Sequence, residues 1–200
     1  MDVDLGSGVR ARRRDWTRAE ILRAAWDIAR RDGVAALSLR EVGARVGMRA
    51  PSLYHYFPSK NALHDAMYGQ GMEQFANEVR ASPAGRNRQE TLRNRARRFV
   101  ATAVSDPVRY ELLFHRPVPG FIPAPEHVGQ AMGFLDQTRQ IATAAGIASD
   151  AAFDLFMATT RGLIDMQIAN EPGGDRWTRL VDEAVGILTA HFGPGAAGDG

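Results

Sequence analysis

The sequence predicts an all-α protein of about nine helices. Apolar residues recur with the helical period of 3.6 between breaks of Gly, Pro and Ser, and no segment sustains the two-residue alternation of a β-strand. Hydrophobic residues make up 44% of the 200 residues, a proportion that supplies a buried core. The expected arrangement is a small N-terminal three-helix domain followed by a larger helical domain.

Capping signals place the first two helices. Thr17 and Glu20 form a capping box at the start of the first helix, which Gly33 ends. Ser38 and Glu41 repeat the capping box a few residues later. This second helix is expected to last about two turns.

The third helix is shorter still. Gly47 ends the second helix, Pro51 suits the first position of the third, and Pro58 prevents it from continuing. Three short helices, the last two joined by a Gly turn, are the organisation of a helix-turn-helix unit.

Six further helices are predicted. Ser59 caps the fourth, which runs to a break at residues 82–85, and Asp106 with Pro107 starts the sixth, which ends near His115. A Pro-rich loop follows at residues 117–125. The fifth helix is expected to run through residues 92–104, and the seventh, eighth and ninth helices are expected at residues 126–145, 150–170 and 176–192.

Charge is divided unevenly along the chain. Residues 1–60 hold 12 Lys and Arg against 7 Asp and Glu, a net charge of +5, whereas residues 61–200 hold 13 against 16, a net charge of −3. Residues 1–60, the basic head of the chain, are the part expected to bind a polyanion. Its first residues form a basic flexible arm that either adds phosphate and minor-groove contacts or stays solvated, and its cations are Arg10, Arg12, Arg13 and Arg14.

Several classes of protein are excluded. The chain has no Cys, so disulfide scaffolds and Cys-based metal clusters or nucleophiles are ruled out. No Gly-rich phosphate motif, nucleophile elbow or zinc-like His spacing occurs. We therefore expect no enzyme activity, metal or cofactor. Without a membrane-spanning run or a secretory signal, the protein is expected in the cytoplasm.

The eighth predicted helix is apolar on two sides, so it needs two neighbours. One solution is a four-helix bundle between two copies, built from the eighth and ninth helices, and the alternative is burial within one subunit. The residues predicted for this homodimer interface are Phe156, Thr160, Leu163, Ile164, Leu180, Val181, Ala184, Val185 and Leu188.

Residues 21–63 carry a dense set of motifs. They are Ser38-Leu39-Arg40-Glu41-Val42, the turn residue Gly47, Leu53-Tyr54-His55-Tyr56-Phe57 and Ser59-Lys60-Asn61-Ala62-Leu63. This pattern resembles the TetR-type (TetR/AcrR) bacterial transcriptional regulators, although Gly43 stands where the family usually has Ala. The stretch from Asp106-Pro107 to Phe114 resembles a subset of that family with a His/Asp-Pro-x-x-Tyr-x-Leu-Leu/Met-Phe motif in its C-terminal domain.

The resemblance implies contacts with double-stranded DNA. A recognition helix of about seven residues presents only its first turn and one face to the major groove. Arg40 suits guanine O6 and N7, or a phosphate, whereas Ser38 and Lys60 suit phosphates. Of the two tyrosines in the third helix, Tyr54 is expected to be the exposed one. The full set of DNA-binding candidates is Ser38, Arg40, Arg49, Ala50, Ser52, Tyr54, His55 and Lys60.

The resemblance also implies a C-terminal domain that senses a small molecule. Apolar residues that line a cavity have the same periodicity as those that fill a core, so both interpretations stay open. The pocket candidates are Met72, Phe75, Phe99, Leu113, Phe114, Phe121, Met132, Leu135, Phe153 and Met157.

Together these features predict a homodimeric, ligand-responsive transcriptional repressor, released from a palindromic operator by a small apolar or aromatic effector. The predicted boundaries are a basic arm at 1–14, a DNA-binding domain at 15–60, a sensing and dimerisation domain at 61–193 and a disordered tail at 194–200. Two alternatives remain: an activator or nucleoid-type DNA binder without a ligand, and an all-α small-molecule binder or enzyme with a structural basic head.

Overall fold

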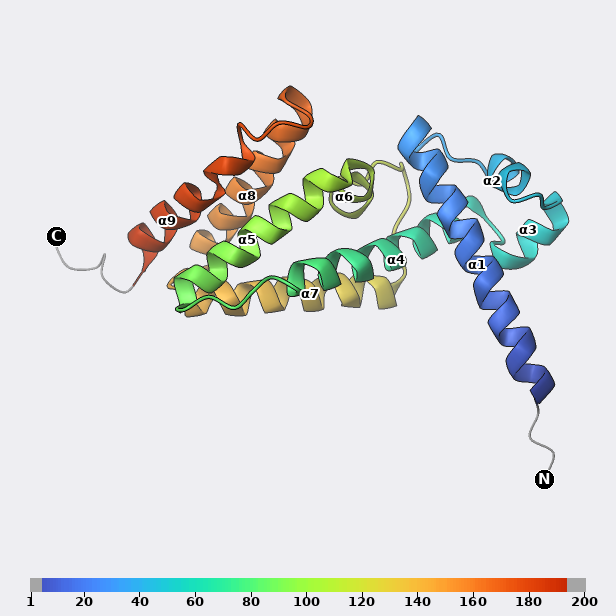
Figure 1. The fold of residues 1–200 in the computed structure, drawn as a ribbon, viewed down its shortest axis with the longest axis horizontal. Coiled ribbons are helices and arrows are strands. Elements are labelled where there is room, and N and C mark those ends of the chain that lie inside the picture. The colour runs from blue at the N-terminus through green and yellow to red at the C-terminus, as the bar shows by residue number, and fades with distance from the viewer. Residues whose placement is uncertain (1–4, 194–200) are drawn as a thin grey trace. The chain divides into compact units, whose positions relative to one another are not determined.

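The computed structural model describes residues 5–193, within which the chain forms nine α-helices and one short 3₁₀ helix (Figure 1). These residues divide into two compact units. The first runs up to Gly71 and includes Glu111–His127, and the second comprises Met72–Tyr110 and the residues from Val128 onward. The predicted tail at 194–200 lies outside the described residues.

The first unit contains the N-terminal helices. Ile21 and Ile28 of the first helix and Val42 of the second are almost wholly buried in its core. Glycine at positive φ closes the first helix, since Gly33 has a φ of +88° and its N–H donates to Ala29 O over 2.8 Å. The helices are α1 (Leu5–Asp32), α2 (Leu39–Arg45), α3 (Ala50–Tyr56) and α4 (Lys60–Arg80), of which α4 continues into the second unit.

The predicted start of the first helix at Thr17 is wrong, because α1 already begins at Leu5. The Thr17 hydroxyl donates to the Arg13 carbonyl oxygen over 2.9 Å, a bond to the preceding turn that exists only inside a helix. Ala and Arg are good helix formers, so residues 10–14 extend the helix instead of ending it. The described part of the predicted flexible arm, residues 5–14, is therefore helical.

The boundaries of the fourth, sixth, seventh and eighth helices follow the sequence closely. Ser59 Oγ accepts from Ala62 N over 3.0 Å at the start of α4, and Ser149 Oγ accepts from Ala152 N over 3.2 Å at the start of α8. The helices after α4 are α5 (Arg88–Ser105), α6 (Pro107–Phe114), α7 (Pro125–Ala144), α8 (Asp150–Asn170) and α9 (Val181–Phe192).

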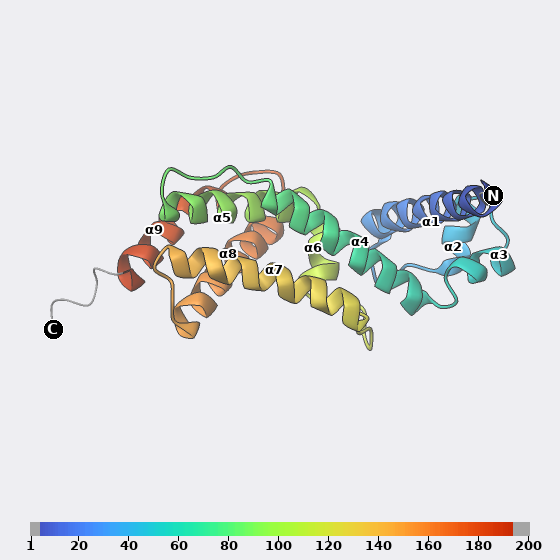
Figure 2. The same cartoon turned by 90° about the horizontal axis from the view of Figure 1, so that it is seen from below.

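The second unit is built around α5, which packs against both α8 and α9 (Figure 1, Figure 2). An aromatic cluster joins α4, α5 and α7 in the same unit. The Phe75 ring lies edge-on to Phe99 at 5.1 Å and to Phe134 at 6.0 Å, and Phe99 stacks on Phe134 at 6.2 Å between centroids. All three rings are buried.

Residues of the Asp106-Pro107 motif serve structural roles. Asp106 Oδ1 accepts from Arg109 N over 3.2 Å and caps α6. The Arg109 guanidinium pairs with Glu78 at 3.2 Å and with Asp106 at 3.1 Å. Burial raises the pKa of Tyr110 to about 12. The motif therefore fixes the corner between α5 and α6.

The ninth helix begins later than predicted. Residues 178–180 form a 3₁₀ turn, and α9 starts at Val181 instead of residue 176. The reason is Gln167 on α8, whose Oε1 accepts from Trp177 N over 2.9 Å and from Thr178 N over 3.3 Å. Its Nε2 also donates to Glu171 O, so one buried amide organises the whole turn.

None of the helices in residues 5–193 combines the length and the hydropathy needed to cross a membrane.

Replacing Gln167 with Leu should lower the free energy of unfolding by about 1–3 kcal/mol, because two backbone N–H groups lose their acceptor. Urea unfolding of the full chain measures this. The matched control is Gln140→Leu, the same change at an exposed position of α7. Equal losses in the two variants would contradict this role of Gln167.

Candidate nucleic-acid interface

The turn between α2 and α3 is closed by its backbone. Gly47 has a φ of +68°, a conformation that favours glycine, and Met48 N donates to Gly43 O over 2.8 Å. At Gly43 a Cβ would lie 3.1 Å from Met48 O and 3.4 Å from a methyl group of Leu53. Glycine at this buried position therefore lets α2 approach the turn closely.

Helix α3 has one buried and one exposed face. Leu53 and, just after the helix, Phe57 are 1% exposed. The residues predicted to contact DNA lie on the opposite side: Arg49, Ala50, Ser52, Tyr54 and His55 are all exposed. Tyr54 is 51% exposed and Tyr56 is half-buried, which confirms the prediction about the two tyrosines.

Helix α1 holds α3 in place through Arg18. The Arg18 guanidinium donates to Tyr56 O over 3.3 Å and lies 4.4 Å from the centre of the Phe57 ring. α2 is tied to α1 by two ion pairs, Arg45 with Asp27 at 3.1 Å and Arg31 with Glu41. These pairs are exposed, so they orient the helices more than they stabilise them.

The other three predicted residues flank α3. Ser38 Oγ accepts from Glu41 N over 3.2 Å as the N-cap of α2, and its hydroxyl proton remains a donor. Arg40 is exposed in the first turn of the same helix. Lys60 Nζ donates to Ala35 O over 2.7 Å, which leaves two of its three protons for another acceptor. All eight predicted residues therefore belong to the first unit and are exposed or half-buried.

Known proteins share this arrangement. Residues 21–67 match the model of bacterial regulatory proteins of the tetR family, and this segment contains α2, the turn, α3 and the first turns of α4. The helix-turn-helix segment of this chain is therefore similar to tetR-family regulatory proteins. The match covers the helix-turn-helix region just described.

Relatives and solved structures extend the likeness beyond that segment. The HTH-type transcriptional repressor Rv1353c of Mycobacterium tuberculosis is 27% identical over 162 residues, and the chain spans 59% of its length. The crystal structure of protein SCO4313 has 25% identity and a TM-score of 0.74, with 89% of this chain and 97% of that one covered. The TetR-family transcriptional regulator SCO4454 from Streptomyces coelicolor shares the fold, with 19% identity, a TM-score of 0.69, and coverage of 88% and 95%.

A segment missed by the sequence analysis packs on the start of α4 within the first unit. Asp65 Oδ1 accepts from Ala124 N over 2.8 Å and lies 3.0 Å from His127 Nδ1. The Phe121 ring meets the edge of His64 at 5.7 Å between centroids. Pro and Gly in residues 117–125 indicate a loop but not where it packs, so the sequence held no signal for this contact.

The predicted pocket residues are divided between the two units. Leu113, Phe114 and Phe121 belong to the first unit and the other seven to the second. Phe75 and Phe99 fill the aromatic core with Phe134, whereas Met132 is 50% exposed. Met72, Leu113 and Phe153 are buried, and Phe114, Phe121, Leu135 and Met157 are half-buried.

The predicted dimer interface needs correction. Six of its nine residues are buried within the protomer, so they cannot face a partner: Phe156, Thr160, Ile164, Val181, Val185 and Leu188. Leu163, Leu180 and Ala184 are half-buried. The large apolar side chains that α8 and α9 expose are instead Leu155, Met166 and Ile187. Helix α8 is apolar on two sides, as predicted. The side that was predicted to face a partner subunit is instead the side that packs in the core of the protomer.

No group of three or more His, Asp or Glu within residues 5–193 is arranged to hold a metal ion.

The buried His64 makes the stability of the chain depend on pH. Burial and then the nearby charge of Lys60 lower the pKa of His64 from its ordinary value of about 6.5. Below about pH 6.5 the unfolded chain therefore binds a proton that the folded chain resists, and the free energy of unfolding falls as the pH drops.

We expect wild-type chain to lose stability between pH 7.5 and pH 5.5, and His64→Leu to lose less, as measured by urea unfolding at both pH values. His55→Leu, at an exposed position of α3, should keep the wild-type pH dependence. An unchanged pH dependence in His64→Leu would show that another group is responsible.

Proposed function

We propose that this chain is a homodimeric transcriptional repressor that binds a palindromic operator and leaves it when a small apolar or aromatic effector binds. The observation that carries the proposal is the exposed polar face of α3, held on a helix-turn-helix domain of the TetR family. Repression is supported by the relative Rv1353c, which is named a transcriptional repressor. Such a protein acts in the cytoplasm, where it meets its operator.

Each exposed residue has a role that its chemistry suits. The first turn of α3, with Arg49, Ala50 and Ser52, enters the major groove. Arg40 donates to guanine O6 and N7 or to a phosphate, because its side chain is exposed in the first turn of α2. Ser38 and Lys60 donate to phosphates that fix the position of each head on the duplex.

The start of α1 adds a second set of cations. Arg10, Arg12, Arg13 and Arg14 are exposed on a helical segment, not on a flexible arm. Their charges favour contact with DNA phosphates and increase the salt dependence of binding.

The exposed apolar face of α8 and α9 is the proposed dimer interface. Leu155 is 47% exposed, Met166 40% and Ile187 61%, and the face also carries the small residues Ala158 and Gly162. Small residues let two helices approach closely, and a four-helix bundle of two copies buries the three large side chains. Two heads at a fixed separation then read two half-sites.

Release by an effector follows from linkage. Such an effector binds better to a conformation in which the two DNA-binding domains do not match the spacing of the half-sites. It then weakens operator binding by the same factor by which the operator weakens effector binding, typically about 5–150-fold. Helix α4 is the proposed connection, because residues 60–71 belong to the first unit and residues 72–80 to the second. The Met and Phe side chains of the second unit suit an apolar or aromatic effector.

Replacing Arg40 with Ala should weaken binding to the wild-type protein's preferred DNA fragment by about 5–150-fold, as expected for losing about 1–3 kcal/mol from one base or phosphate contact. Titration at fixed salt measures this, and the dimer should persist. Arg88→Ala removes the same charge from an exposed position of α5 and should bind like wild type. Equal affinity of Arg40→Ala and wild type would remove Arg40 from the interface.

Replacing Ile187 with Glu should convert the dimer to a monomer, because two carboxylates would be buried against an apolar face. Sedimentation equilibrium measures the mass. Ile122→Glu is the matched control, since Ile122 is 82% exposed in the other unit and should leave the dimer intact. A dimeric Ile187→Glu would place the interface elsewhere.

A further inference from the structure

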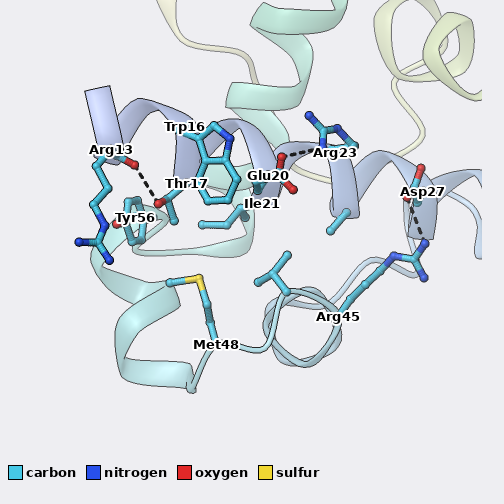
Figure 3. Close-up of a pocket in the computed structure, with 12 residues that line it drawn as sticks. Arg13, Trp16, Thr17, Glu20, Ile21, Arg23, Asp27, Arg45, Met48 and Tyr56 are labelled. Carbon is cyan, nitrogen blue, oxygen red and sulfur yellow. Dashed lines mark hydrogen bonds and ion pairs between the residues drawn. The ribbon is translucent and has the colours of Figure 1, made fainter. Parts of the chain in front are cut away.

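A groove of about 470 Å³ lies in the first unit, between α1 and the α2–α3 turn (Figure 3). One wall is α1, from Arg13 to Asp27, and the other is the α2–α3 turn with Arg45, Val46 and Met48. Tyr56, the last residue of α3, closes one end. A volume of this size is within the range of small-molecule sites.

The middle of the groove is apolar and has an aromatic wall. Ile21 and Ala24 of α1 and Val46 and Met48 of the turn line it. The Trp16 indole stands over it and is 66% exposed, so its ring is available to a ligand (Figure 3). A thioether opposite an indole suits a flat aromatic ring, because sulfur and aromatic rings attract each other.

The charges along the groove are unequal at its two ends. Glu20 pairs with Arg23 at 2.6 Å, and Asp27 pairs with Arg45 at 3.1 Å, so both acids are neutralised locally. Arg13 lies at the other end beside Tyr56 (Figure 3), and no carboxylate in the described part of the chain pairs with its guanidinium. The groove thus offers one cation next to an apolar, aromatic-lined slot.

We propose that this groove binds a flat aromatic molecule that carries a carboxylate. The carboxylate accepts from the Arg13 guanidinium, whose fork matches its two oxygens, and the ring lies between Trp16 and Met48. An apolar slot beside one cation suits a single charge better than the row of phosphates of a DNA strand, which is a poorer occupant. The proposal does not rest on the proposed function, although Arg13 is also one of the cations assigned there to DNA phosphates.

The three tryptophans of the chain make the site directly observable. Full-length protein labelled with 5-fluorotryptophan gives one fluorine NMR signal for each of Trp16, Trp26 and Trp177, assigned with single Trp→Phe variants. Naphthalene-2-carboxylate is the probe, and naphthalene-2-carboxamide is its uncharged control. The Trp16 signal should shift and saturate with the carboxylate, which should bind about tenfold more tightly than the carboxamide because the charged contact is lost in the latter.

Arg13→Gln should reduce the affinity for the carboxylate to that for the carboxamide. Arg14→Gln, an exposed neighbour that does not line the groove, should bind the carboxylate like wild type. Unchanged Trp26 and Trp177 signals show that each variant is folded. A Trp16 signal that stays fixed while Trp177 moves, equal binding of the two probes, or wild-type affinity in Arg13→Gln would each overturn the proposal.

Discussion

Helix α3 has only seven residues, too few to persist in water on its own hydrogen bonds, so its structure depends on the burial of Leu53 and Phe57. Burying both side chains fixes which face of α3 is left outside. Leu53 packs close to Gly43 of α2, and Arg18 of α1 joins the end of α3 through a hydrogen bond to Tyr56 O and a contact with the Phe57 ring. The exposed residues of α3 are therefore positioned by tertiary packing, not by helix propensity.

Local signals in the sequence were sufficient where a side chain acts on its own turn. Ser38, Ser59 and Ser149 cap the helices that follow them, and Gly33 and Gly47 take positive φ at helix ends. Local signals were insufficient where a residue's structure depends on contacts outside its own turn. Thr17 has the sequence of a cap but lies inside α1, because the described residues before it, from Leu5 on, are already helical.

The errors in the second unit have a common physical origin. Periodicity identifies the apolar faces of a helix but not which neighbour each face meets, so the core face of α8 was taken for the dimer interface. The late start of α9 depends on Gln167, ten residues away, and the packing of Phe121 and Ala124 on α4 depends on a loop. The periodicity of a single helix does not predict such contacts between separate elements.

The central claim is that two copies of the α3 face read paired half-sites. The most direct test selects fragments of sheared genomic DNA with the purified full chain at physiological salt and determines the spacing within any enriched motif. The account predicts an enriched palindrome whose half-site centres are separated by about one helical turn of DNA, 10–10.5 base pairs, or a multiple of it. Weak, salt-sensitive binding to all fragments without enrichment would contradict it.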